Sequence, residues 1–94
     1  FEKKALDFIN KLERNLKALA NRRRLAILKY LKENREAPVG DIAAEINLSF
    51  KATSKHLGVL AAVDIVEKNQ RSSQMFYRLA SPVKPVARYI LSLI

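Results

Sequence analysis

The sequence contains no cysteine and only one histidine, His56. A chain without thiols cannot form a disulfide, a thiolate metal site or a thiol redox sensor. One imidazole cannot supply a multi-histidine metal site. The sequence also shows no carboxylate pair, no Ser–His–Asp set and no phosphate-binding loop, and it has only two glycines. We therefore expect neither an enzyme nor a bound cofactor or metal.

Acidic residues and long apolar runs are also scarce. Nine Asp and Glu stand against eighteen Lys and Arg, which gives a formal charge of +9 and favours a polyanionic partner such as nucleic acid. No apolar run approaches the ~20 residues that span a bilayer. The first ten residues carry charges of both signs, unlike a signal peptide. We expect a cytoplasmic protein with no membrane partner, folded as one domain over residues 1–94.

The stretch from Leu48 to Val63 combines an apolar face with a cationic one. Ser49 is a suitable N-cap, and Thr53, Leu57 and Leu60 recur at i, i+4 and i+7, which predicts a buried helical face. The opposite face carries Lys51, Ala52, Lys55 and His56, and no carboxylate occurs in the stretch. Such a helix suits the DNA major groove. The alternative is an amphipathic surface helix whose lysines are merely solvated.

Three further helices are predicted before this stretch, at Glu2–Ala20, Arg22–Asn34 and Gly40–Ile46. Asn21 can cap the second helix, and Asn47 tolerates the left-handed conformation that ends the third. A polar connection, Asn34–Pro38, lies between them. The turn between the third helix and Ser49 is short enough for a helix-turn-helix.

The triplet Arg22, Arg23 and Arg24 lies in the first turn of the second helix, where cations oppose the helix dipole. One interpretation is that these side chains hold phosphate or an acidic residue of the first helix. The other, which we favour, is a solvated cluster in which Arg24 makes a structural ion pair.

After Val63 the apolar period changes from helical to two. Ile65–Gln70 and Gln74–Leu79 are predicted strands, joined by a polar turn at Arg71, Ser72 and Ser73. The tip of this hairpin carries no acid and displays Lys68, Asn69, Gln70, Arg71 and Gln74. It could be an ordinary solvated hairpin, but a cationic tip also fits a minor groove or a phosphate backbone.

Ser81 and Pro82 provide an N-cap and a first-turn proline for a last helix that is strongly apolar. Together with the first helix, it offers more apolar surface than a soluble monomer usually exposes, which predicts a symmetric homodimer. Phe1 would add to this surplus. The expected interface comprises Phe8, Leu12, Val83, Val86, Ala87, Ile90, Leu91 and Ile94.

Three stretches resemble the ArsR/SmtB family of winged-helix repressors: LKALANRRRLAILKYL (16–31), DIAAEINLSFKATSKHLGVL (41–60) and DIVEKNQRSSQMFYRL (64–79). The resemblance covers nearly the whole chain. It implies a mainly α fold with a small β-hairpin, in which five helices and a two-stranded antiparallel wing form a winged helix-turn-helix. It also implies a homodimeric repressor that binds double-stranded DNA sequence-specifically.

By this resemblance the recognition-helix contacts are Lys51, Ala52, Ser54, Lys55 and His56. The wing contacts expected from the cationic hairpin tip are Lys68, Gln70 and Arg71. Pro38 and Gly40 occupy the family's metal-binding cysteine positions, and no Asp, Glu or His follows Pro82. Metal sensing is therefore not expected. Asp64 replaces the usual glycine before the wing. The alternative function is a winged-helix module that binds protein or RNA. The sequence does not indicate an effector.

Overall fold

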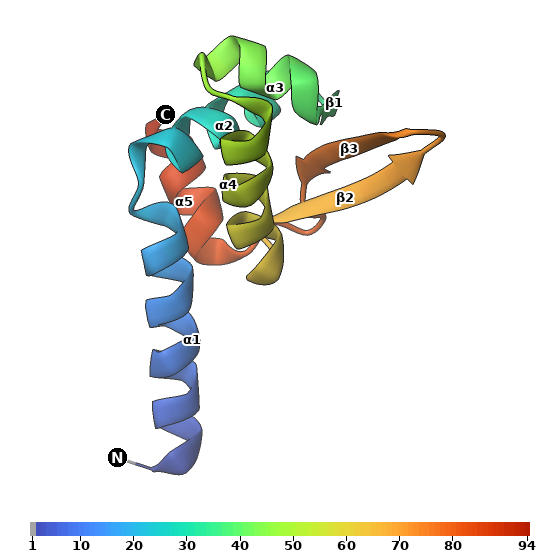
Figure 1. Cartoon of the computed structure of the whole chain (residues 1–94). Helices are drawn as coiled ribbons and strands as arrows, with labels where there is room; N and C mark the ends of the chain where they lie inside the picture. Colours follow the sequence, from blue (N-terminus) through green and yellow to red (C-terminus); the bar gives the residue numbers. More distant parts are fainter. Residues whose placement is uncertain (1) are drawn as a thin grey trace.

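A computed structural model describes residues 2–94, so Phe1 lies outside the described residues. The elements in chain order are α1 (Lys3–Leu19), α2 (Arg22–Glu33), β1 (Ala37–Pro38), α3 (Val39–Ile46), α4 (Phe50–Ala62), β2 (Val66–Arg71), β3 (Gln74–Leu79) and α5 (Pro85–Leu93). The predicted winged helix-turn-helix order of five helices and a hairpin is confirmed. Two parts project from the body in Figure 1, the long helix α1 and the β2–β3 hairpin.

Polar caps and one left-handed residue position the helix-turn-helix. The side chain of Asn21 accepts hydrogen bonds from the backbone N–H groups of Arg23 and Arg24, at 3.0 and 3.1 Å. Ser49 accepts from the N–H of Ala52 at 3.1 Å, which confirms the predicted cap of α4. Asn47 ends α3 with a φ of 54°, also as predicted. These local signals fix where α3 ends and α4 begins.

The last helix starts later than the sequence suggested. Ser81 and Pro82 do not begin it, because α5 starts at Pro85 and Lys84 is its N-cap residue. A residue before proline is disfavoured in the helical region, and Lys84 is indeed extended, with φ −60° and ψ 145°. Pro85 then occupies the first helical position, where its missing N–H costs nothing.

The sheet contains one more strand than the predicted two-stranded wing. Its order is β1-β3-β2 with both pairings antiparallel, and the expected connection at Ala37–Pro38 forms the short edge strand β1. Proline is tolerated there because an edge strand leaves one side unpaired. The hairpin turn is Ser72–Ser73, with Ser72 at a φ of 53°, while Arg71 belongs to β2. Asp64, at a φ of 59°, takes the left-handed conformation before the wing.

The core is centred on α2 and receives one face of each neighbouring element. Its largest fully buried side chains are Ile27, Leu28, Ile42, Thr53, Leu57, Leu60 and Ile65. The predicted inward face of α4 is therefore confirmed. Only the C-terminal end of α1 joins this core, through Ala18 and Leu19. Among residues 2–94, no helix is long and apolar enough to cross a bilayer.

Candidate nucleic-acid interface

The outer side of α4 carries the predicted recognition residues. Lys51 and Lys55 are exposed one turn apart, while Ala52, Ser54 and His56 are half-buried. The helix is held in place by the burial of its opposite face against α2 and α3. Because α4 contains no carboxylate, neither lysine is neutralised within its own helix. This face can donate hydrogen bonds and balance phosphate charge.

His56 lies at the edge of this face and contacts an arginine from α2. Its Nδ1 lies 3.2 Å from the Nη1 of Arg24. A guanidinium only donates, so Nδ1 is the acceptor and the ring proton is on Nε2. Burial, followed by the charges of Arg24, Arg23 and Lys55, lowers the pKa of His56 below its usual value. The imidazole is thus held neutral, with Nε2–H as its donor.

Arg24 also caps the end of α1. Its Nε donates to the carbonyl of Ala18, and its Nη2 donates to the carbonyl of Lys17 at 3.2 Å. Within residues 2–94 Arg24 forms no ion pair with a carboxylate, so the prediction of a structural ion pair at Arg24 is wrong. The last carbonyls of a helix lack intrahelical partners and carry partial negative charge, which a guanidinium satisfies. No spacing rule in the sequence marks this contact.

The wing exposes Lys68 and Gln70, but Arg71 already has partners. Its guanidinium bonds the Glu36 carboxylate and lies 4.1 Å above the ring of Phe76. The hydrogen bond from Arg71 lowers the pKa of Glu36. The hairpin tip itself carries no acid, as expected, but Glu36 comes from the segment before β1 and reaches Arg71 across β3. Gln70 bonds the carbonyl of Ser72 at 3.2 Å.

Phe50 is a candidate that the sequence reasoning missed. It is the first residue of α4, it is 62% exposed, and it is next to Lys51. Pro38, Gly40 and Met75 line a small cavity beside it. The available sequence signal was a large apolar side chain directly after the N-cap and off the predicted buried face of α4.

The predicted dimer residues divide into exposed and buried groups. Phe8 is 64% exposed and Leu12 is also exposed, whereas Val83, Val86, Ile90 and Ile94 are half-buried. Ala87 is fully buried and Leu91 is 8% exposed. Ala87 and Leu91 pack into the protomer's own core and have almost no surface left for a partner. They are therefore removed from the expected dimer interface.

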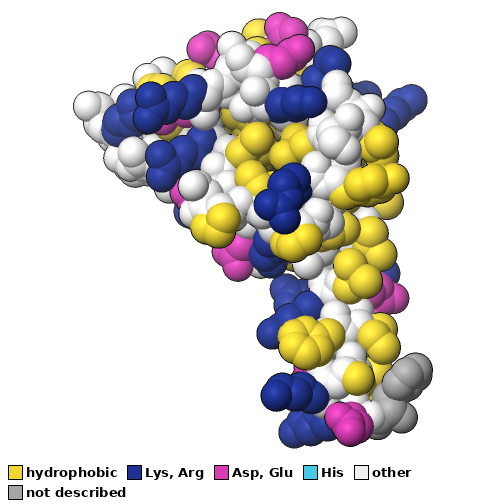
Figure 2. Space-filling model, turned by 180° about the vertical axis from the view of Figure 1, so that it is seen from behind, with side chains coloured by type: hydrophobic (Ala, Val, Ile, Leu, Met, Phe, Trp, Pro, Cys, Tyr) yellow, Lys and Arg dark blue, Asp and Glu magenta, His cyan; other side chains and the backbone are white. Residues whose placement is uncertain are grey.

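A wider apolar face is exposed on the two terminal helices. We call it the terminal-helix face, and it consists of Leu6, Phe8, Ile9, Leu12 and Leu16 of α1 with Tyr89 and Leu93 of α5. An apolar hollow of about 310 Å³ adjoins it, and its lining consists of Leu16, Leu19, Ala20, Leu25, Ile90, Leu93 and Ile94. Apolar side chains follow the length of the projecting helix in Figure 2. Such a continuous face is unusual on a monomer.

Comparison with known proteins agrees with this geometry. Residues 19–69 match a family described as a helix-turn-helix domain. The transcriptional activator HlyU of Vibrio cholerae is 41% identical over 66 residues, which cover 70% of this chain but only 60% of that relative. A solved structure of V. cholerae HlyU is 31% identical with a TM-score of 0.79, covering 97% of this chain and 92% of the other.

Two other solved structures share the fold. The homodimeric winged helix-turn-helix DNA-binding domain of a possible ArsR-family regulator from Mycobacterium bovis is 29% identical with a TM-score of 0.86, covering 99% of this chain and 83% of that one. The transcriptional repressor BigR of Xylella fastidiosa is 29% identical with a TM-score of 0.75, covering 99% and 89%.

The fold and these relatives define a winged helix-turn-helix transcriptional regulator, a class of DNA-binding proteins without enzymatic activity. The chain belongs to the helix-turn-helix domain family and, within it, to the ArsR-type regulators.

Proposed function

We propose that the protein binds double-stranded DNA sequence-specifically, with α4 in the major groove and the hairpin against the flanking backbone. The observation that carries this proposal is the exposed, carboxylate-free side of α4, where Lys51 and Lys55 are one turn apart. A major groove admits one helix and is bordered by phosphates that such lysines contact. An RNA- or protein-binding module would not require the tight α3–α4 turn that presents this helix.

Each residue of the interface has a separate role in this proposal. Lys51 and Lys55 contact phosphates or base edges, and Ser54 and His56 donate hydrogen bonds. Ala52 and Phe50 make apolar contacts, for which the thymine methyl group is the natural partner in the groove. Lys68, Gln70 and Arg71 of the wing contact phosphates or the minor groove.

The functional unit that we propose is a symmetric homodimer joined through the terminal-helix face. A two-fold axis lets this apolar face bury itself against its own copy, and the homodimeric state of the M. bovis domain supports the idea. A dimer presents two copies of α4 to successive major grooves. Its site is then an inverted repeat with half-site centres about 34–36 Å apart, or a multiple of that spacing.

We further propose that the protein represses transcription and does not sense metal. The description of BigR as a repressor supports the first point, although HlyU is described as an activator. Absence of cysteine from the sequence supports the second. Transcription in vitro from a template that carries the selected site tests whether the protein represses or activates. Repression predicts that less transcript is made as more of the site is occupied by the dimer.

Selection from a random duplex pool tests the whole proposal. We expect one inverted repeat to be enriched, and fluorescence anisotropy to show binding at least ~10³-fold tighter than to unrelated duplex. The same sequence as double-stranded RNA is the control, because its deep, narrow major groove does not admit a helix. Equal affinity for RNA and DNA, or no enriched motif, would favour the module that binds RNA or protein.

A further inference from the structure

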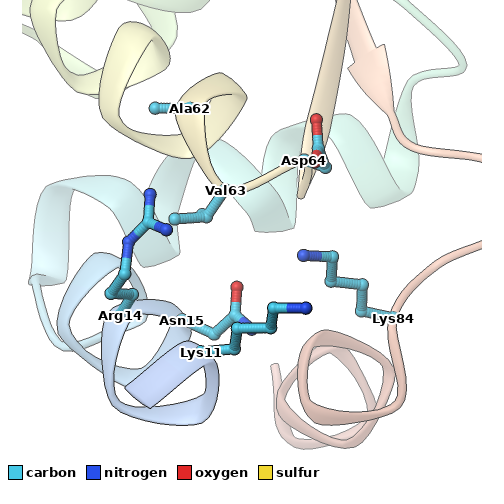
Figure 3. A pocket seen from close by; sticks show the side chains of 7 residues that line it. All are labelled: Lys11, Arg14, Asn15, Ala62, Val63, Asp64 and Lys84. Carbon is cyan, nitrogen blue, oxygen red and sulfur yellow. The ribbon is translucent and has the colours of Figure 1, made fainter. Parts of the chain in front are cut away.

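A cavity of about 240 Å³ lies on the side of α1 that faces α4. Its walls come from α1, from the end of α4 with the following turn, and from the segment before α5. The lining residues are Lys11, Arg14, Asn15, Ala62, Val63, Asp64 and Lys84. Figure 3 shows Lys11, Asn15 and Lys84 bordering one space, with the Arg14 guanidinium beside Val63 and the Asp64 carboxylate turned away from that space. None of these residues belongs to the proposed DNA-binding or dimer surfaces.

The charged groups of this cavity are not paired with one another. Within residues 2–94, Lys11, Arg14, Asp64 and Lys84 take part in no ion pair, and the three basic side chains donate no hydrogen bond to a protein atom. Three cations and one carboxylate leave the lining with an excess of two positive charges. The cavity therefore attracts an anion and has donors free to bind it.

Asn15 provides a second, independent sign of a ligand. It is only 8% exposed, and its Oδ1 is buried without a hydrogen-bond partner in the described chain. In Figure 3 this oxygen points into the space between α1 and Val63. A buried acceptor without a partner is costly, and proteins satisfy nearly all such atoms. A ligand that fits this cavity must therefore bring a hydrogen-bond donor.

Those two requirements together define the ligand chemistry. Lys11, Arg14 and Lys84 attract an anion, whereas the buried Asn15 Oδ1 is an acceptor that requires an O–H group. We propose that this cavity is a binding site for a protonated oxyanion, of which inorganic phosphate is the simplest. At neutral pH both forms of inorganic phosphate keep at least one O–H, while sulfate has none. The site therefore discriminates between two anions of similar size and shape.

The proposed dimer leaves this cavity accessible. Lys11, Asn15 and Ala18 follow one another at i, i+4 and i+7 on one face of α1, toward the body. Leu12 and Leu16 lie on a different face of the same helix and belong to the terminal-helix face. Phe8 of that face shares the stripe of Lys11 and Asn15, at i, i+3 and i+7, so the dimer surface borders the oxyanion site at its Lys11 end and is separate from it along Leu12 and Leu16.

NMR titration of the ¹⁵N-labelled protein without DNA tests the site independently of the proposed function. Sodium phosphate and sodium sulfate are added at pH 7.5 and constant ionic strength, and the Asn15 side-chain amide is followed. We expect saturable shifts, with phosphate at least about tenfold tighter, because sulfate leaves a buried acceptor unsatisfied. Methyl phosphate, almost entirely an unprotonated dianion at this pH, should bind as weakly as sulfate.

Variants separate the contributions of charge and proton recognition. Asn15→Leu fills the same volume without an acceptor, so the preference for phosphate over sulfate should fall toward one. Lys11→Ala combined with Lys84→Ala should weaken both anions about tenfold. Both lysines lie at the surface of the cavity, so the fold should be retained. Lys4→Ala removes a charge from α1 outside the cavity and should change nothing.

Several outcomes would overturn the proposal. Equal affinities for phosphate, sulfate and methyl phosphate would mean that Asn15 Oδ1 does not distinguish an anion with an O–H group from one without. Shifts that never saturate, or that spread over the surface lysines, would mean general ion association. An effect of Lys4→Ala equal to that of the Lys11 and Lys84 variant would lead to the same conclusion.

Discussion

Arg24 of α2 and His56 of α4 are in direct contact, with 3.2 Å between Nη1 and Nδ1. The same guanidinium donates to the carbonyls of Lys17 and Ala18 at the end of α1. One side chain therefore connects the recognition helix, through α2, to the helix that carries most of the terminal-helix face. The contact requires a neutral imidazole, because only an unprotonated Nδ1 accepts.

Lowering the pH should therefore weaken the fold through His56. Its pKa is lowered in the native state, mainly by burial and then by Arg24, while the unfolded value is about 6.5. Between these two values the unfolded chain binds more protons. The stabilisation is thus complete above about pH 6.5 and is lost as pH falls through the native pKa. Urea denaturation from pH 7.5 to 5 should show this loss, and His56→Asn should flatten it.

An NMR titration of the single histidine gives the direct check of this mechanism. We expect its midpoint to lie below 6.5, and Arg24→Gln should move it only part of the way back, because burial is the larger cause. A native midpoint at or above 6.5 would contradict the neutral, hydrogen-bonded imidazole.

Phe8→Asp should dissociate the proposed dimer without unfolding the protomer. The ring is 64% exposed on α1, so a carboxylate there harms no intrachain core but brings unpaired charge into the apolar interface. Asn10→Asp is the matched control, since it introduces the same carboxylate on the opposite side of the helix. Sedimentation should give a monomer for Phe8→Asp and a dimer for wild type and control. A monomeric wild type at micromolar concentration would refute the dimer.

Glu36→Gln should increase DNA affinity modestly. In the wild-type protein Glu36 forms an ion pair with the guanidinium of Arg71 and adds a negative charge beside the wing. An exposed ion pair contributes little, so releasing Arg71 for phosphate should raise DNA affinity by only about two- to fivefold. Glu33→Gln removes a carboxylate from the end of α2 that forms no ion pair within residues 2–94, so it should have a smaller effect. Weaker binding by Glu36→Gln would mean that the pair positions Arg71 instead.

Zinc and cadmium should leave DNA binding unchanged. Zn²⁺ sites normally need three or four Cys, His or carboxylate ligands, whereas the chain has no Cys and its one His contacts Arg24. Anisotropy titrations with micromolar Zn²⁺ or Cd²⁺ check this, with and without chelator. A tenfold loss of affinity that chelator reverses would contradict it.

The sequence predicted elements whose signals are local. The inward face of Thr53, Leu57 and Leu60 follows from helical periodicity, and the caps at Asn21 and Ser49 follow from side-chain chemistry. The predicted start of the last helix was wrong. The N-cap and first-turn proline signal at Ser81 and Pro82 is weaker than the effect of Pro85, which disfavours a helical conformation at the residue before it. Both the cap signal at Ser81 and Pro82 and the constraint from Pro85 are local, so the sequence alone was enough to decide which one sets the helix start.

Long-range contacts could not be predicted in this way. The partners Arg71 and Glu36 are far apart in the sequence, and the pairing of both β1 and β2 with β3 brings them together. Likewise, apolar spacing indicated that Ala87 and Leu91 are buried, but it could not indicate whether the protomer or a second copy buries them. The buried acceptor of Asn15 carries no sequence signal at all.

The most direct test of sequence-specific binding through α4 is the salt dependence of the double variant Lys51→Ala, Lys55→Ala on the selected inverted repeat. If each lysine contacts a phosphate, removing both should weaken binding and reduce the slope of log K against log salt by about 1.8 per α4. Lys3→Ala with Lys4→Ala removes equal charge from the far end of α1 and should leave the slope near the wild-type value. Unchanged affinity and slope for the Lys51 and Lys55 variant, at both low and moderate salt, would contradict recognition through α4.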